Sequence, residues 1–378
     1  AYLKNTVLIF DECHRSQFGD MHVAITKKFK KYYIFGFTGT PIFPENAGSG
    51  KPNLMTTEHA FGRQLHTYTI VNAINDKNVL PFKIEYIRTI KEKEEIEESK
   101  VWDIAREAAL ADPRRRSNIV TSILQHFNQK TKRNDKSYPY RVLRNVSTMA
   151  SSKGKAEEIR EKISLTGFNS IFAVSSIDTA RMYYTEFKRQ MEELPISQRL
   201  KVATIYSYGA NENLDDFLDD ENSEDTVALD QSSRDFLESA IRDYNAMFGT
   251  SYDTSSDKFQ NYYKDVSLRM KNRELDLLIV VNMFLTGFDA TTLNTLWVDK
   301  NLRMHGLMQA YSRTNRILNS IKTFGNIVCF RNLEDATNQS ISLFGDETTS
   351  GMVLLKSYDD YYYGFKDKDG KDVVRVAC

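Results

Sequence analysis

The chain has 378 residues, with 51 basic and 51 acidic side chains and therefore a formal net charge of zero. Its content of 41% hydrophobic and 27% charged residues is typical of a globular protein, and the length favours two or three domains of roughly 100–200 residues each. Three scattered cysteines exclude a disulfide framework, and there is neither a membrane-length apolar run nor a signal-peptide pattern, so we expect a cytoplasmic protein. Taken alone, the zero net charge argues weakly against binding to nucleic acid.

The charges are distributed unevenly along the chain. Residues 91–107 are helix-prone with an acidic surplus, and residues 113–162 contain 13 Lys and Arg against 4 Asp and Glu. Residues 211–265 reverse the balance, with 15 acidic side chains against 4 basic ones. Such blocks are most often solvated faces and loops, and the alternative for the basic block is a surface that follows DNA phosphates.

Seven short apolar runs that end in polar or glycine-containing turns predict buried parallel strands. In chain order they are Thr6–Phe10, Tyr33–Phe37, Ser170–Val174, Val202–Ile205, Asp276–Val281, Thr295–Val298 and Asn326–Phe330. Helical patterns lie between the later runs, at Asp178–Leu194, Asp235–Met247 and Leu307–Leu318. Strands that alternate with helices predict an α/β fold with parallel sheets flanked by helices.

Ser175 and Asp178 directly follow the third strand and open the next helix in a capping-box arrangement. The backbone N–H groups at such a helix start can bind an anion.

The first strand runs straight into Asp11 and Glu12. Two carboxylates at the carboxyl end of a strand are suited to hold a hydrated Mg²⁺ at nucleotide phosphates and to polarise a water molecule. A strand that ends in an ordinary turn is the alternative. Cys13 and His14 do not predict a metal site, because no second Cys or His pair has the spacing of ligands.

Three further polar segments follow strands or lie on a predicted helix. The second strand ends in Thr38-Gly39-Thr40-Pro41, and the strand at Asp276–Val281 leads to Thr286-Gly287-Phe288-Asp289. In the last helix, Gln309, Arg313 and Arg316 fall within roughly 60° of one another at 100° per residue. Two cations and an amide on one face suit a polyphosphate, and a surface arginine pair is the alternative.

Taken in order, these segments resemble motifs II, III, V and VI of superfamily 2 helicases and translocases. The strings DECHRSQFG, FGFTGTPIF, FLTGFDA and QAYSRTNR are more narrowly similar to the motor (R, restriction) subunit of type I restriction enzymes, the HsdR family. The resemblance covers essentially all of residues 1–330. It implies RecA-like parallel sheets, use of ATP and Mg²⁺, and movement along duplex DNA.

The resemblance also implies roles for individual residues. On the nucleotide side, it implies that Asp11 binds Mg²⁺ and that Glu12 acts on the attacking water. It implies that Thr38 and Thr40 couple the ATP and DNA sites, and that Gly287 and Asp289 contact the nucleotide. It implies that the phosphates are contacted by Gln309, Arg313 and Arg316. On the DNA side, it implies contacts from Thr286 and from Ser175 and Ser176, which resemble motif IV. We add the basic run Arg114, Arg115 and Arg116 as candidate DNA contacts.

The implied domains are a C-terminal part of RecA-like domain 1 at residues 1–89 and a charged helical linker at 90–165. RecA-like domain 2 follows at 166–332 with an acidic insertion at 211–265, and residues 333–378 begin a region that docks the modification and specificity subunits.

The sequence lacks the phosphate-cradling motif G-x-x-x-x-G-K-[ST] that such a motor needs. Gly48–Pro52 is the nearest match, but it has no glycine at the earlier position, ends in proline and follows no strand. The segments Glu98–Lys100 and Glu186–Lys188 match the last element of a PD-(D/E)xK nuclease only by chance. We therefore expect a fragment that begins at motif II, has an incomplete first domain and is inactive alone. Another superfamily 2 motor and a truncated module that serves only as a binding surface stay open as alternatives.

Overall fold

The structure is a computed structural model that describes residues 5–14, 20–43, 56–89, 109–152, 154–206 and 231–344, and three two-residue strands after them. Four segments discussed above lie outside the described residues, namely the acidic stretch at 91–107, the loop at 48–52, residues 211–230 of the acidic block and most of the expected docking region after 344.

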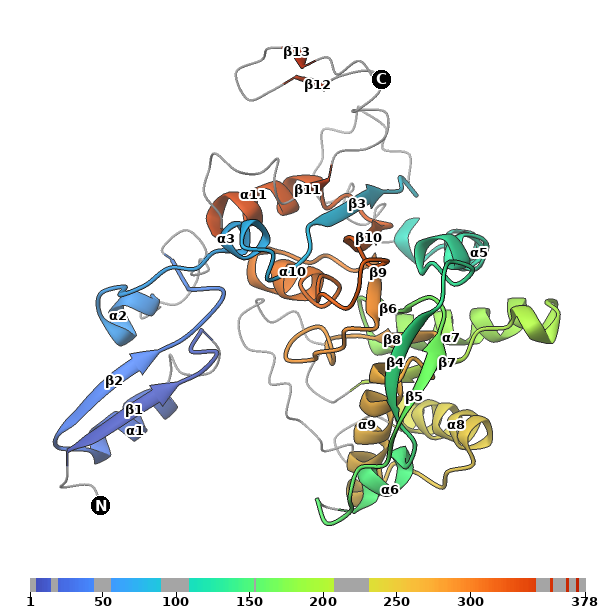
Figure 1. Cartoon of the computed structure of the whole chain (residues 1–378), viewed down its shortest axis with the longest axis horizontal. Coiled ribbons are helices and arrows are strands. Elements are labelled where there is room, and N and C mark those ends of the chain that lie inside the picture. The colour runs from blue at the N-terminus through green and yellow to red at the C-terminus, as the bar shows by residue number, and fades with distance from the viewer. Residues whose placement is uncertain are drawn as a thin grey trace.

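A two-stranded parallel sheet forms near the N-terminus from β1 (Thr6–Phe10) and β2 (Tyr32–Gly36). Helix α1 (Asp20–Lys28) lies between the strands in sequence, and α2 (Thr57–Phe61) packs against β2. Phe61 contacts Phe10 edge to face, with ring centroids 5.6 Å apart. This unit lies beside the larger sheet, at the lower left of Figure 1.

A seven-stranded parallel sheet has the order β11-β3-β10-β9-β6-β8-β7. Its strands are β3 (Phe82–Tyr86), β6 (Asn169–Val174), β7 (Val202–Ile205), β8 (Leu277–Val280), β9 (Leu293–Asp299), β10 (Gly325–Cys329) and β11 (Leu354–Leu355). Strands β6 to β10 are buried along their whole length, as their nearly continuous apolar sequences require. The predicted α/β class with RecA-like parallel sheets is confirmed.

Helices pack around this sheet (Figure 1). They are α3 (Ile70–Asn75), α5 (Pro113–Lys130), α7 (Ile177–Glu192), α8 (Gln231–Phe248), α9 (Ser256–Lys271), α10 (Met304–Tyr311) and α11 (Glu334–Phe344). Helix α5 packs against α7, and α10 packs against α11. Phe172 of β6 contacts Tyr183 and Phe187 of α7, which fixes this helix on the sheet. None of the described helices is long and apolar enough to cross a membrane.

An antiparallel strand pair extends from the large sheet. It consists of β4 (Tyr138–Leu143) and β5 (Arg160–Leu165), with α6 (Val146–Ser151) between them. The side chain of Asn272 exchanges two hydrogen bonds with the backbone of Leu143, at 2.9 and 2.7 Å, and so fixes the pair to the end of α9. The remaining elements are the 3₁₀ turn η2 (Ile196–Gln198) and the antiparallel strands β12 (Phe365–Lys366) and β13 (Asp372–Val373).

The structure differs from the expected domain division in two places. Strand β3 pairs with β10, so residues 82–86 belong to the large sheet although the boundary at residue 89 placed them with the first block. In the acidic block, residues 231–265 form α8 and most of α9, whose apolar faces lie in the core, so this part does not lie wholly at the surface. Asp265 shows that an acidic residue need not lie at the surface. It is fully buried and accepts hydrogen bonds from Tyr244 and Arg269, both at 2.6 Å.

Candidate nucleotide and DNA site

Asp11 and Glu12 form an exposed turn at the carboxyl end of β1. The backbone N–H of Glu12 donates to Asp11 Oδ1 at 2.9 Å. Glu12 has a φ of 46°, a left-handed conformation that non-glycine residues rarely adopt and that often occurs at functional turns. The second carboxylate oxygen of Asp11 has no partner among the described residues, so it is available to a cation.

His14 joins this turn to the turn after β2. Its Nδ1 lies 2.6 Å from Thr38 Oγ1 and 3.5 Å from Glu12 Oε2. The backbone N–H of Thr40 also donates to Thr38 Oγ1, at 3.0 Å. The two strand ends that were predicted separately are therefore one hydrogen-bonded unit, as expected when parallel strands end at the same edge.

Gln309 of α10 connects this unit to the large sheet. The Gln309 amide donates to His14 Nε2 at 2.9 Å and to Thr40 Oγ1 at 3.2 Å. With the Gln309 amide nitrogen facing His14 Nε2, the imidazole would accept at Nε2 and donate from Nδ1 to Thr38. One turn earlier, His305 stacks on His14 with ring centroids 5.7 Å apart, and its Nε2 lies 3.1 Å from the carbonyl oxygen of Pro41. Burial lowers the pKa of His305, which favours its neutral form.

The prediction that Gln309, Arg313 and Arg316 share one face of a helix is wrong. Helix α10 ends at Tyr311, so Arg313 lies in the turn that follows it and Arg316 lies in the irregular segment after that turn. Arg313 still folds back onto the helix, because its Nε donates to Gln309 O at 3.0 Å while Nη1 donates to Phe288 O at 2.7 Å. The helix ends early because the chain must turn at the buried Thr314 and Asn315 to reach β10, which helical periodicity does not reveal.

Asp289 and Arg316 form an ion pair, with Arg316 Nε 3.2 Å from Asp289 Oδ1. The loop that carries Asp289 turns at Gly287, whose φ of 66° suits glycine. Both charged side chains are substantially exposed. The two predicted segments around residues 286–289 and 309–316 are therefore in direct contact.

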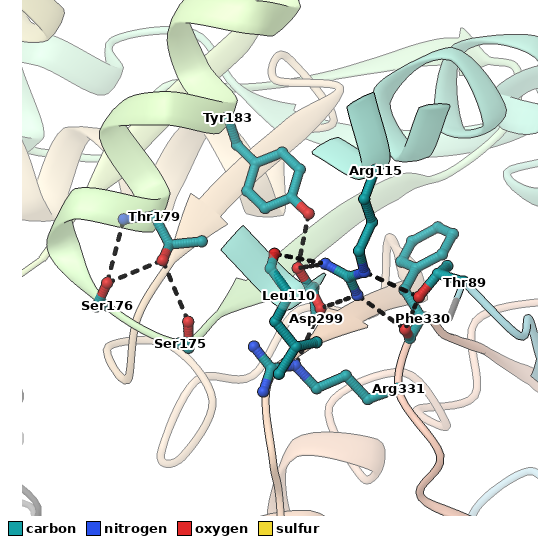
Figure 2. Close-up of polar contacts among 10 residues, drawn as sticks. All are labelled: Thr89, Leu110, Arg115, Ser175, Ser176, Thr179, Tyr183, Asp299, Phe330 and Arg331. Atoms are coloured by element: carbon teal, nitrogen blue, oxygen red, sulfur yellow. Dashed lines mark hydrogen bonds and ion pairs between the residues drawn. The ribbon is translucent and has the colours of Figure 1, made fainter. Parts of the chain in front are cut away.

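Ser175 and Ser176 lie at the carboxyl end of β6, where α7 begins, as predicted. Ser176 is the N-cap and accepts from the N–H of Thr179 at 3.1 Å, one residue later than the expected capping position. Figure 2 shows both serine hydroxyls directed at Thr179, at 3.2 and 2.9 Å. Thr286 is half-buried in the loop before Gly287.

Arg115 is buried and does not form the expected DNA contact. Figure 2 shows its guanidinium paired in a bidentate manner with Asp299, at 2.9 and 2.6 Å. Its other N–H groups donate to Thr89 Oγ1 at 2.9 Å and to the carbonyl oxygens of Phe330 and Leu110 at 3.0 and 3.4 Å. All five donors are thus used inside the protein, and none is left for a phosphate.

The same cluster is centred on Asp299, which also accepts from Tyr183 Oη at 2.6 Å and Arg331 Nε at 3.0 Å. Burial alone would raise the pKa of the Asp299 carboxyl, but the hydrogen bonds and charges of Arg115 and Arg331 hold it below its ordinary value.

The two arginines beside Arg115 have different surroundings. Arg114 is exposed, and its guanidinium has no partner among the described residues. Arg116 is half-buried, with Nη1 2.9 Å from the sulfur of Met182. Of the basic run, Arg114 is the side chain best placed to reach a phosphate.

A cysteine- or histidine-based metal centre is not present in the described part of the chain, where no group of three His, Cys, Asp or Glu residues could hold an ion. Burial raises the pKa of Cys13 to about 11, which favours its protonated form at neutral pH. The donor set does fit Mg²⁺, which takes few carboxylates and keeps several of its waters. Asp11, exposed at the strand end, would hold it.

Sequence reasoning missed His305 and did not assign a role to His14. The signal for His305 was its spacing, because it lies four residues before Gln309 and thus on the same helical face. The signal for His14 was its position two residues after Glu12.

Two family models match this chain. Residues 166–332 match that of type I restriction enzyme subunit R domain 3, and residues 2–116 match that of the SWI2/SNF2 ATPase.

Relatives match nearly the whole chain. The endonuclease subunit of a type I restriction enzyme from Staphylococcus aureus strain COL is 39% identical over 373 residues, which are 96% of this chain and 34% of that relative. A Staphylococcus saprophyticus endonuclease subunit of the same type is 39% identical over 369 residues, with the same coverage. A solved fragment described as an HsdR subunit from Vibrio vulnificus YJ016 has 14% identity and a TM-score of 0.48, and covers 97% of this chain and 49% of that chain. The chain spans about one third of the length of these curated relatives, and over that length it belongs to the family of type I restriction enzyme endonuclease subunits.

Proposed function

We propose that this chain is part of the ATP-driven DNA motor of a type I restriction enzyme, and that it couples ATP hydrolysis to translocation along duplex DNA before the DNA is cleaved. The observation that carries the proposal is the bridge made by Gln309. This one amide joins the turns that contain His14 and Thr40 to the helix that precedes Arg313 and Arg316. A nucleotide-dependent motor needs such a link between its two sheets.

On the nucleotide side, the charge of each residue would determine its role. Asp11 would hold Mg²⁺, which when bound supplies neutralisation of phosphate charge. Glu12 would accept the proton of the attacking water. Arg313 and Arg316 would stabilise the charge that develops on the phosphates, with one of them acting as an arginine finger. Gly287 and Asp289 would contact the nucleotide.

The hydroxyl residues would connect nucleotide and DNA. Thr38 and Thr40 share the hydrogen-bond network of His14, so a shift at one turn is transmitted to the other. On the DNA side, Ser175, Ser176 and Thr286 would contact backbone phosphates, with Arg114 as an additional cation. The partners in this proposal are duplex DNA and the modification and specificity subunits of the complex.

The test uses the full-length subunit assembled with its partners. Asp11→Ala and Arg316→Ala should each abolish DNA-stimulated ATP hydrolysis and translocation while leaving the melting temperature near that of the wild type, because both side chains are exposed. Lys188→Ala, an exposed cation on α7, is the matched control and should keep full activity. Normal turnover in either site variant would contradict the assigned roles.

The chain by itself should not hydrolyse ATP at a useful rate, because its sequence contains no phosphate-cradling loop. DNA-stimulated turnover by the purified 378-residue chain would contradict this part of the proposal.

A further inference from the structure

Lys322 is a buried lysine in the loop that joins α10 to β10. Its exposed fraction is 2%, although lysines in loops are normally solvated. Its Nζ donates to Thr291 O at 2.9 Å and to Leu293 O at 2.6 Å. The ammonium therefore holds the backbone between Asp289 and the start of β9.

The loop around Lys322 is itself fixed. Asn319 Oδ1 accepts from the backbone N–H groups of Ile321 and Lys322, at 3.0 and 3.1 Å. This turn begins shortly after Arg316, so a short segment connects Arg316 to Lys322. Arg316 in turn forms an ion pair with Asp289. Lys322 holds the backbone that follows Asp289, so the three residues are connected to one another.

Lys322, Asp289 and Arg316 also interact electrostatically. Burial lowers the pKa of Lys322 to about 7, while the Asp289 carboxylate opposes this shift and the Arg316 guanidinium adds to it. An apolar side chain of similar length would fill this space without the cost of desolvating an amine. A buried amine here thus needs a reason beyond packing.

We propose that Lys322 is a positioning residue of the nucleotide site, which sets the places of Asp289 and Arg316 by holding the backbone after Asp289. The inference rests on the proposed function, since the placement of these two side chains matters only if they meet a nucleotide.

The experiment compares Lys322→Met with Lys132→Met in the full-length subunit assembled with its partners. Lys132 is a matched control, because its Nζ donates to the carbonyl oxygen of Ile321 in the same loop, at 2.5 Å. Both variants release one lysine from this loop, but only Lys322 holds the backbone beside Asp289. We expect Lys322→Met to lower kcat for DNA-stimulated ATP hydrolysis about tenfold and Lys132→Met to change it less than twofold.

Two further variants separate positioning from folding. Lys322→Arg keeps a cation and N–H donors and should recover most of the lost turnover. Asp289→Asn should lower turnover by itself, and Lys322→Met should then add little, because the two changes act through one element.

The possible failures are distinguishable. A wild-type enzyme without DNA-stimulated hydrolysis would overturn the proposed function. An active wild type in which both lysine variants behave alike would overturn the role of Lys322, as would a loss of folding in both Lys322→Met and Lys322→Arg, since that would make the side chain part of the core only.

Discussion

Two neighbouring arginines at the start of α5 have opposite surroundings. Arg115 is 6% exposed and uses all five donors inside the protein, whereas Arg114 is exposed. The run of three arginines does not by itself show which one is buried, although Arg115 lies four residues before Ile119 and therefore on the apolar face of α5. The partner of Arg115 is also 184 residues away in the chain, at Asp299.

Replacement of each arginine by methionine should therefore have different effects. Arg115→Met leaves the Asp299 carboxylate buried with fewer donors, and removal of one partner from a buried pair typically costs about 3–5 kcal/mol. Arg114→Met should leave stability unchanged and lower the salt dependence of DNA binding by about 0.9 in log–log slope if it contacts a phosphate. Urea denaturation and DNA titrations at several salt concentrations measure the two effects. Equal stability of the two variants would contradict the burial of Arg115.

Lys322 should make the stability of the chain depend on pH. Burial lowers its pKa from the ordinary 10.5 to about 7, so between these values the unfolded chain binds a proton that the folded chain lacks. The contribution of Lys322 to stability should accordingly rise with pH from about 7 to 10 and should be constant below that window. Denaturation curves of wild type and Lys322→Met across this range measure it. A stability difference between them that does not change with pH would contradict the low pKa.

At the scale of elements, the close approach of β10 to the turn after α10 determines where Arg313 and Arg316 lie. A Cβ added at Gly325 would lie 2.3 Å from Thr314 Oγ1 and 3.1 Å from its Cβ. Thr314 is fully buried, with its hydroxyl donating to Tyr311 O at 2.8 Å, and has no room to move away. Glycine is needed here for space.

Gly325→Ala should therefore destabilise the chain by about 1–3 kcal/mol, the usual cost of overpacking, and should also lower ATP turnover of the full-length subunit because the arginine turn moves. Gly306→Ala is the control, because Gly306 lies inside α10 and an added Cβ meets nothing within 4 Å. It should stabilise the chain by roughly 0.5–1 kcal/mol through helix propensity. Thermal denaturation of both variants measures these changes in stability. An unchanged stability of Gly325→Ala would contradict the close contact.

The strands were largely predictable, and the helices and pairings less so. Fully buried parallel strands such as β8 have continuous apolar sequences, and the sequence located them to within a residue or two. The amphipathic helices α5 and α9 were not predicted, because charged residues occupy some of their buried positions, Arg115 in α5 and Asp265 and Arg269 in α9. The partner of β3 was also not predictable, since pairing with β10 depends on a contact across more than two hundred residues. Of the site, the strand-end residues were predicted and the bridge from Gln309 to His14 was not.

At the scale of the whole molecule, ion pairs engage part of the basic block at 113–162. Arg144 pairs with Glu161 at 2.5 Å, Arg160 with Glu158 at 2.6 Å, and Lys130 of α5 with Glu85 of β3. The count of 13 basic and 4 acidic residues already includes Glu158 and Glu161 but not Glu85, so only a partner from another segment is invisible in it.

The small sheet presents an apolar face that the described residues leave uncovered. Val7 and Ile9 of β1 are 57% and 67% exposed, and their neighbours on β2, Tyr33 and Phe35, are 68% and 40% exposed. Parallel sheets are normally covered on both faces, and exposed apolar patches promote association.

The purified chain should therefore self-associate and bind a hydrophobic dye. The double variant Val7→Thr with Ile9→Thr should reduce both effects, whereas Ile196→Thr, at a single site that is 83% exposed, should not. Sedimentation velocity at several concentrations and dye fluorescence measure the outcome. A wild-type chain that stays monomeric without binding dye would contradict the prediction.

The contacts of the Arg115 guanidinium also bear on whether the fold survives cleavage of the backbone. This guanidinium contacts Thr89 and Leu110, which lie before and after the segment at 90–108. Of two polypeptides produced by cutting within 90–108, one would contain Thr89 and the other Leu110 and Arg115, with β3 still inserted between β10 and β11. We expect the two pieces to remain one particle in gel filtration and to reassemble when they are expressed separately. The buried arginine would thus allow this protein to be made as a split pair, and Arg115→Met should weaken that reassembly.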